Sequence, residues 1–421
     1  MEAADNQFRL AYKFELMVKP GQAHLLRLFC GHCRFCYNQM LSMLMDEYEA
    51  YKKVLEELKG QGKSETEILT YQKEHRPKLR KFDLTGERLR QLKEQYPFLN
   101  QCHSQVLQQK VQDLHSAYKN FFEQPANGYP RFKKKGQQDS IRFPQGYKLD
   151  EANKRIFLPK LGFIRYRKSR EIIGKIKNVT VSLSHGKWYM SIQTEFPLVP
   201  ILTHANLETA VGIDVGVVKL ATLSDGQFYA PLKGLVRPIA DKIAILQQRL
   251  QHNTKGSYRN RELKQRINKL HGRAANLRHN YLHQITSSIV KDHDYVIVED
   301  LNLKGMTKSA SGTMEEPGSN VTAKSGLNRS ILEEGLGELV RQLEYKLKLK
   351  GGILIKVDPR NTSRTCPRCG HVDKENRKTQ AGFCCVKCGY SNNADLVGAI
   401  NIKRAGLARL GSESGHEPEQ L

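Results

Sequence analysis

The sequence has no run of about 18 uncharged apolar residues, so it predicts no membrane-spanning helix. Its first five residues include two acids and no apolar core, so a secretory signal peptide is not expected. The nine cysteines are odd in number. Without a signal peptide they fit a reducing cytoplasm, where metal binding or packing takes precedence over disulfides. No internal repeat is present.

Acidic residues are also scarce relative to basic ones. The 421 residues include 43 Asp and Glu against 68 Lys and Arg, which gives a formal charge of +25. Such an excess favours a polyanionic partner, with nucleic acid ahead of an anionic membrane surface. Solubility alone is the simpler explanation, but the basic residues cluster: residues 126–180 hold 15 Lys and Arg against 4 acids, and residues 237–283 hold 11 against 2. Clusters of this kind suit a phosphate track.

The length predicts two to four domains, and a 39% hydrophobic fraction is ordinary for a globular protein. Apolar residues alternate over residues 8–16, which predicts a strand, and helical spacing follows over residues 22–124. Short strands are expected at 141–143, 155–158 and 162–166, followed by a hairpin of 178–183 with 188–194. This basic all-β unit predicts a small barrel completed by the first strand.

The pattern changes to mixed α/β after a linker at residues 197–207. Strands are expected at 211–215, 217–223, 295–299 and 353–357, with a basic helical stretch over 237–290 that breaks near Gly256 and Gly272. A helix through residues 332–347 should end at Gly351, and a final helix should cover 394–405. We expect a mobile loop at 304–328 and a disordered tail after 405.

Two Cys-x₂-Cys pairs, Cys366/Cys369 and Cys385/Cys388, are separated by 15 residues. Each pair can form a knuckle, and this gap lets a hairpin bring both knuckles to one tetrahedral Zn²⁺. Four thiolates leave no open coordination position, so the site should be structural. Cys384 is the surplus thiol and is not expected to be a ligand.

Three further cysteines, Cys30, Cys33 and Cys36, repeat at intervals of three residues. This spacing places them along one helical face, where cysteine behaves as a small hydrophobe. No downstream pair completes a tetrahedron, so core packing is expected rather than a second metal site.

Three acids belong to elements of the mixed α/β region: Asp214 in a buried strand, Glu299 at a strand end, and Asp395 at a helix start. A carboxylate on a buried strand is costly unless it meets a cation or a hydrogen-bond donor. Convergence of the three would create a site for two hard metal ions, able to activate water against a phosphodiester.

Each acid alone also has a simpler interpretation. Asp395 could cap its helix, and Glu299 could be a surface acid. Asp300 competes with Glu299, but neighbours on a strand face opposite ways, so only one can serve. Gly212-x-Asp214-x-Gly216 could also be the phosphate turn of an actin-like ATPase, although the adjacent zinc module fits a nucleic-acid enzyme better.

The ordered set of motifs resembles the TnpB family of insertion-sequence-encoded nucleases, which are similar to compact type V CRISPR effectors. The resemblance spans residues 8–405. It is carried by these segments: Gly212-Ile213-Asp214, Val298-Glu299-Asp300-Leu301, Thr362 to Gly370, Cys385 to Tyr390, Asn393-Ala394-Asp395, the residues Arg34, Tyr37 and Asn38, and Gly128-Tyr129-Pro130-Arg131-Phe132-Lys133. The departures are the additional cysteines at 30, 33 and 384 and the tail after 405, and neither affects the acids.

The resemblance implies a multidomain α/β protein: an RNase H-like RuvC nuclease domain with an inserted zinc ribbon, and a small β-barrel wedge domain carrying a helical insert. The implied boundaries are the wedge at 1–20 and 126–205, the helical recognition domain at 21–125, the nuclease domain at 206–362 and 392–405 with a lid loop at 304–328, the target-nucleic-acid-binding zinc ribbon at 363–391, and the disordered tail at 406–421.

The resemblance also implies the activity, an RNA-guided DNA endonuclease acting beside a short motif by two-metal hydrolysis at a single site. Asp214, Glu299 and Asp395 would bind two Mg²⁺, and Cys366, Cys369, Cys385 and Cys388 would bind structural Zn²⁺. The nucleic-acid contacts expected are Arg34, Tyr37, Asn38, Arg131, Lys133, Lys134, Lys135, Arg165 and Arg167.

The expected partners are a guide RNA and target double-stranded DNA, with no membrane, in a complex containing one protein chain. The expected location is the bacterial or archaeal cytoplasm, at the nucleoid when on DNA. Three alternatives remain: a compact type V CRISPR effector, a nuclease-inactive RNA-guided repressor, and a guide-free junction resolvase. The repressor would typically lack one or more of the acids, and the resolvase would need neither a zinc ribbon nor a large helical insert.

Overall fold

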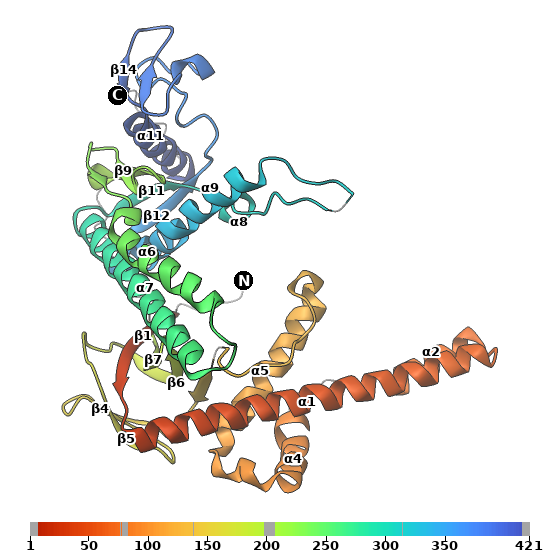
Figure 1. Cartoon of the computed structure of the whole chain (residues 1–421). Helices are drawn as coiled ribbons and strands as arrows, with labels where there is room; N and C mark the ends of the chain where they lie inside the picture. The colour runs from red at the N-terminus through yellow and green to blue at the C-terminus, as the bar shows by residue number, and fades with distance from the viewer. Residues whose placement is uncertain are drawn as a thin grey trace. The chain divides into compact units, whose positions relative to one another are not determined.

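A computed structural model describes residues 7–75, 77, 83–137, 139–197, 207–313 and 315–414. The chain forms two compact units, residues 1–198 and 199–421 (Figure 1). Within the described ranges, every helix is too short or too polar to cross a bilayer. The expected linker lies mostly outside these ranges.

The first unit is built on a seven-stranded sheet in the order β2-β6-β7-β1-β5-β4-β3, in which all neighbouring strands are antiparallel. The strand bounds are β1 Gln7–Met17, β2 Ser140–Phe143, β3 Lys148–Asp150, β4 Arg155–Leu158, β5 Gly162–Tyr166, β6 Lys175–Ser184 and β7 Lys187–Pro197. The predicted hairpin is confirmed, with Val181 opposite Met190 and Leu183 opposite Trp188. The short strand β3 was not predicted, because three residues carry too little alternation.

The N-terminal strand holds this sheet together. The part of β1 from Gln7 to Glu15 pairs with β7, and its last two residues pair with β5. Inward-facing side chains at every second position, including Tyr12, Phe14 and Leu16, are buried. The alternation of residues 8–16 correctly predicted a strand. This strand joins both halves of the sheet.

Helices cover the interval between β1 and β2: α1 Pro20–Gly60, α2 Glu65–His75, α4 Leu89–Gln95 and α5 Ser104–Glu123, with a π-helical turn at Leu84–Arg88 and a 3₁₀ turn at Pro97–Gln101. Cys30, Cys33 and Cys36 all lie on the buried face of α1, in the same hydrophobic core as the sheet. Their predicted packing role is confirmed.

The second unit contains a five-stranded sheet in the order β10-β9-β8-β11-β12. Its strands are β8 Val211–Val215, β9 Ala221–Leu223, β10 Phe228–Tyr229, β11 Tyr295–Glu299 and β12 Ile353–Val357. The first three pair antiparallel, whereas β8, β11 and β12 are parallel. A separate two-stranded ribbon of β13 Gly382–Cys384 and β14 Ser391–Asn393 belongs to the cysteine module.

Helices cover both faces of the five-stranded sheet. Val296 and Val298 of β11 share a core with α7 Tyr258–Asp292 and α10 Leu336–Lys350. Ile297, between them, packs with α11 Ala394–Ser414 on the other face. A strand covered on both faces is apolar at every position, which is why β11 reads as a continuous hydrophobic run.

Several predicted boundaries in this unit are wrong. The strand expected at 217–223 covers only Ala221–Leu223, and the helix expected through residues 332–347 is divided at Gly335. The basic stretch divides into α6 Leu232–Gln251 and α7, as expected near Gly256, but α7 continues through Gly272. The 304–328 segment is not all loop, because α8 Leu303–Met306 and α9 Val321–Glu334 occupy its ends (Figure 1). The last helix extends through Ser414, so the described part of the expected disordered tail is helical, and residues 415–421 lie outside the described residues.

Candidate functional site

Asp214 lies on the face of β8 that is covered by α11. Its neighbour Gly212 on the same face is so close to the helix that a Cβ atom there would lie 2.1 Å from the carbonyl oxygen of Ala399. At the residue before Ala399, a Cβ at Gly398 would lie 2.9 Å from Asp214 Oδ2. The two glycines thus let α11 pack directly over the carboxylate of Asp214.

Glu299 ends β11, the strand that pairs with β8. The hydroxyl of Thr362 donates a hydrogen bond of 2.6 Å to Glu299 Oε1. Asp300, the alternative in the sequence, is exposed, and its backbone N–H donates to the carbonyl of Val357. The structure therefore favours Glu299 over Asp300 as the inward-facing acid.

Asp395 is in the first turn of α11, but it does not cap the helix. Asn393 does so: its Oδ1 accepts from the backbone N–H of Asp395 at 3.0 Å. The carboxylate of Asp395 is instead met by two cations, with Lys219 Nζ 3.7 Å from Oδ2 and Arg377 Nη2 3.5 Å from Oδ1. Arg377 comes from the cysteine module, so that module contributes a charge to the site.

Electrostatics connects the three acids. Burial, followed by the charges of Glu299 and Asp395, raises the pKa of Asp214 to about 7, although Arg377 and Lys219 act in the opposite direction. Burial also raises the pKa of Glu299, against the hydrogen bond from Thr362. Burial is the larger cause, but the contributions of Glu299 and Asp395 show that the three carboxylates lie close enough to interact.

This cluster holds more negative charge than its two cations balance. Carboxylate oxygens are the ligands that Mg²⁺ prefers, so the donor set fits a hard divalent cation. The carboxylates lie farther apart than the four thiolates of the cysteine module. In the described part of the chain, these cysteines form the group whose ligand atoms all lie within 4.8 Å of one another.

The cysteine set consists of Cys366, Cys369, Cys385 and Cys388, as predicted. The Sγ atoms of Cys366 and Cys388 are 3.6 Å apart, and so are those of Cys369 and Cys385. A tetrahedron of Zn–S bonds of about 2.3 Å requires a spacing of about 3.8 Å, so the geometry fits zinc. Cys384 is exposed and outside the set.

Tight turns shape both knuckles. Gly370 and Gly389 follow the second cysteine of each pair with φ of 72° and 70°. Their N–H groups donate back to the carbonyls of Cys366 and Cys385. Buried Asn376 links the knuckles, because its amide donates to the His371 carbonyl while its oxygen accepts from the Val386 N–H.

The residues predicted to contact nucleic acid divide into two groups in the first unit. Arg131, Lys133, Lys134 and Lys135 are exposed, as are Arg165 and Arg167, although Arg167 lies 4.0 Å from Glu15. Arg34, Tyr37 and Asn38 instead have internal partners. Their contact with nucleic acid stays a prediction, but in the structure they contact other residues of the chain.

Arg34, Tyr37 and Asn38 position the basic segment 131–135. Asn38 exchanges two hydrogen bonds with the backbone of Lys133, at 2.8 and 3.0 Å. Lys133 Nζ lies 5.0 Å from the ring centre of Tyr37, which is only 1% exposed. Arg34 pairs with Asp139 just beyond the segment at 3.1 Å. These contacts support a cationic strip on the surface.

Comparisons with known proteins agree with this geometry. Family models match residues 337–402 ("Cas12f1-like, TNB domain"), residues 190–310 ("Probable transposase") and residues 8–53 ("Helix-turn-helix domain"). The last range folds here as β1 and part of the single helix α1. The "Putative RNA-guided DNA endonuclease InsQ" of Escherichia coli is 44% identical over 401 residues, covering 95% of this chain and 93% of that protein. The chain belongs to the TnpB family.

More distant relatives extend the same family relationship. A "Putative RNA-guided DNA endonuclease" of Streptomyces pristinaespiralis is 28% identical, and the alignment covers 78% of this chain and 77% of that protein. Among solved structures, a Cas12f1 in complex with a single guide RNA and target DNA aligns with a TM-score of 0.51 at 15% identity, covering 95% of this chain and 99% of that one. The likeness shows a shared fold.

Sequence reasoning missed four residues of the site. Thr362 holds Glu299, and Asn393 caps the helix that carries Asp395. Asp395 is flanked by Lys219 and Arg377. The four residues have no recognisable sequence spacing from the acids. Thr362 and Asn393 occur within TnpB motifs, which was the available signal. Lys219 and Arg377 are ordinary basic residues in a basic chain, and their role depends on folding.

Proposed function

We propose that this chain is an RNA-guided DNA endonuclease encoded by a transposable element, with Asp214, Glu299 and Asp395 as its metal-binding catalytic acids. The observation that carries the proposal is the meeting of these acids, which come from β8, β11 and the start of α11. Burial, followed by the charges of Glu299 and Asp395, raises the pKa of Asp214 to about 7. The sequence relationship to named RNA-guided endonucleases supports the guide and DNA specificity.

The sheet of the second unit supports an RNase H-like, RuvC-type nuclease domain: three successive antiparallel strands are followed by two parallel ones, with helices on both faces. The all-antiparallel sheet of the first unit would serve as the wedge, and its helices α1 to α5 as the recognition domain. The segment joining α8 and α9 would form the lid.

Mg²⁺ bound by the acids would supply Lewis-acid stabilisation of charge on the phosphodiester that is cut. The chain itself contributes orientation and charge. Thr362 holds the carboxylate of Glu299, and Asn393 caps α11 so that Asp395 remains available. Lys219 and Arg377 provide positive charge beside Asp395, where phosphate oxygens of a bound strand could also be held.

The four cysteines would hold a structural Zn²⁺, since all positions of a tetrahedron are filled by thiolates. The module would bind target nucleic acid and also carry Arg377 to the acids. The exposed strip of Arg131, Lys133, Lys134 and Lys135 is the proposed nucleic-acid contact of the first unit, together with Arg165 and Arg167.

The test is cleavage of a plasmid by purified protein, guide RNA and Mg²⁺. We expect Asp214→Ala to abolish cutting while RNA still binds, and Asp300→Ala, at the exposed neighbour of Glu299, to cut normally. Wild-type cutting by Asp214→Ala would refute the assignment of the acids, and equal cutting after removal of the RNA would refute guidance.

A compact CRISPR effector would have the same chemistry but would take its guide from a repeat array, and the sequence of copurified RNA distinguishes the two. An inactive repressor is disfavoured because all three acids are present and adjacent.

A further inference from the structure

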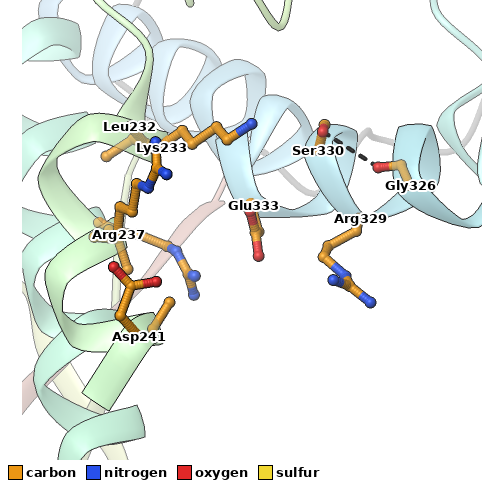
Figure 2. Close-up of a pocket in the computed structure, with 11 residues that line it drawn as sticks. Leu232, Lys233, Arg237, Asp241, Gly326, Arg329, Ser330 and Glu333 are labelled. Carbon is orange, nitrogen blue, oxygen red and sulfur yellow. Dashed lines mark hydrogen bonds between the residues drawn. The ribbon is translucent and has the colours of Figure 1, made fainter. Parts of the chain in front are cut away.

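A cleft of about 540 Å³ lies in the second unit, lined by α6, α7 and α9. Figure 2 shows Lys233, Arg237 and Asp241 on one side and Arg329 and Glu333 on the other. Arg278 of α7 also lines the cleft. Four cations therefore meet two acids, and the cleft carries a net positive charge. None of its lining residues belongs to the acid cluster or to the cysteine module.

In the described ranges, none of the four cations lies within ion-pair distance of an acid, and Arg278 acts on buried Glu334 only as a nearby charge. Among the described residues, the side chains of Lys233, Arg237, Arg278 and Arg329 form no hydrogen bond or ion pair. The Nε atom of Arg278 is buried and unpartnered. A buried guanidinium donor without an acceptor is costly, so such a group usually has a partner supplied from outside the chain.

A second hollow of about 570 Å³ shares Arg278, Arg329 and Glu333 with the first. It extends along α9 past Ser325 and Asn328 towards the segment after α8. Asn328 donates to the carbonyls of Thr307 and Lys308, but its Oδ1 is buried without a partner. Together the hollows form an elongated groove with cations at one end and an unused amide acceptor at the other.

A buried carboxylate fixes the walls of this groove. Glu334, 1% exposed at the end of α9, accepts hydrogen bonds from the backbone N–H groups of Leu232 at 2.6 Å and Lys233 at 3.1 Å. It thereby ties α9 to the first turn of α6 and satisfies that helix end. The free donors of the groove are therefore the cationic side chains, held at a set separation.

We propose that this groove binds the phosphodiester backbone of a nucleic acid. The inference rests on the proposed function and adds a binding site to it. Separate, unpaired cations suit successive phosphates, each of which releases counterions when neutralised. An elongated shape with an amide acceptor suits a sugar-phosphate chain better than one compact anion. RNA and DNA share this backbone chemistry, and the experiment distinguishes them.

The test measures affinity against salt concentration for an RNA hairpin and for a DNA duplex of equal length, using full-length Asp214→Asn protein so that nothing is cut. Arg237→Gln and Arg329→Gln should each weaken binding several-fold and lower the slope of log K against log salt by about 0.7 to 1. Glu333→Gln and Asp241→Asn, within the same cleft, should strengthen binding. The polymer whose slope changes is the occupant.

Unchanged affinity and slope for both polymers in both arginine variants would overturn the inference while leaving the endonuclease proposal intact. Absence of RNA binding by the parent protein would overturn the endonuclease proposal, and absence of binding to both polymers would overturn the groove as well. Misfolding is not a concern at these positions, since the altered arginines have no partner in the fold, and unchanged thermal unfolding checks this.

Discussion

At Asp214, folding places an acid where burial and two other acids oppose its ionisation. Its pKa rises from 3.8 to about 7, so the folded chain binds a proton more tightly than the unfolded chain does. In the absence of divalent metal, this group therefore reduces stability progressively as the pH rises from about 4 to 7. A bound cation would relieve that cost.

We predict that Asp214→Asn stabilises the metal-free second unit by about 2 kcal/mol more at pH 8 than at pH 5, and abolishes cleavage. The amide cannot ionise, so it avoids the cost that wild type meets at pH 8. Urea unfolding in EDTA at both pH values measures the difference. Asp300→Asn is the control, because that side chain is exposed. An equal effect of Asp214→Asn at both pH values would contradict the raised pKa.

Thr362 provides a second prediction, about orientation. Its hydroxyl donates to Glu299, so Thr362→Val should raise the Mg²⁺ concentration needed for half-maximal cleavage by about 10-fold, as is typical of lost partners of metal ligands. Thr362→Ser keeps the donor and should restore the wild-type requirement. Saturating Mg²⁺ should recover most of the rate. An unchanged Mg²⁺ requirement in the valine variant would show that Thr362 does not orient Glu299.

The three acids could be predicted from sequence because carboxylates on otherwise apolar elements are chemically conspicuous. Their partners could not. Tyr37 and Asn38 were expected to contact nucleic acid. In the structure, Tyr37 is buried beneath Lys133, and Asn38 forms hydrogen bonds with the backbone of Lys133. The sequence shows that such residues are present, whereas burial and partners appear only in the folded chain.

At the scale of elements, the site depends on how closely α11 approaches the sheet. A Cβ at Gly212 would lie 2.1 Å from the oxygen of Ala399 and 2.5 Å from the nitrogen of Lys403. Both are backbone atoms, which cannot rotate away. Any side chain at Gly212 must therefore push the helix off β8 and carry Asp395 with it.

Gly212→Ala should destabilise the second unit by more than about 3 kcal/mol and abolish cleavage, because packing and site geometry fail together. Gly234→Ala is the matched control: it lies within α6 with open space around the added Cβ, and it should stabilise by about 0.5–1 kcal/mol. Chemical unfolding measures both variants. A neutral Gly212→Ala would show that α11 does not pack as described.

Close packing of α11 on the sheet also explains a wrongly predicted helix boundary. The last helix was expected to end at residue 405, but the next residue, Gly406, lies against Ile297, where a Cβ would be 2.4 Å from Cγ1. The glycine permits close packing, and the helix continues so that Leu407 and Leu410 join the core beneath it. Conversely, Gly335 does end α9, with φ of 67°. Sequence alone does not distinguish a glycine needed for contact from one needed for a turn.

The cysteine module offers a prediction about metal content. Purified protein should contain one zinc per chain, and Cys369→Ser should lose it, whereas Cys384→Ser should retain it because Cys384 lies outside the cluster. Zinc loss should reduce cleavage at least 10-fold, since Arg377 belongs to this module and Asn393 adjoins it. Elemental analysis and cleavage rates test this. Full activity in zinc-free Cys369→Ser would show that the acid cluster does not depend on the cysteine module.

For the whole molecule, the two units have separate hydrophobic interiors. One core spans residues 12–192 and includes the buried cysteines of α1, while the clusters around the five-stranded sheet and the cysteine module are drawn entirely from residues 210–410. The change of sequence pattern near residue 200 predicted this division. Cooperative unfolding follows shared cores, so a single transition is not expected for the chain.

Calorimetry of the free protein should therefore show two transitions. Gly212→Ala should lower only the one that belongs to the second unit, and zinc removal should act on that same transition. For the first unit, Phe143→Ala removes a fully buried side chain from its core and should lower the other transition, with a cost of about 3–5 kcal/mol. The two substitutions combined should be additive, because their sites share no partner. One transition that moves as a whole with either substitution would mean that the units fold as a single cooperative structure.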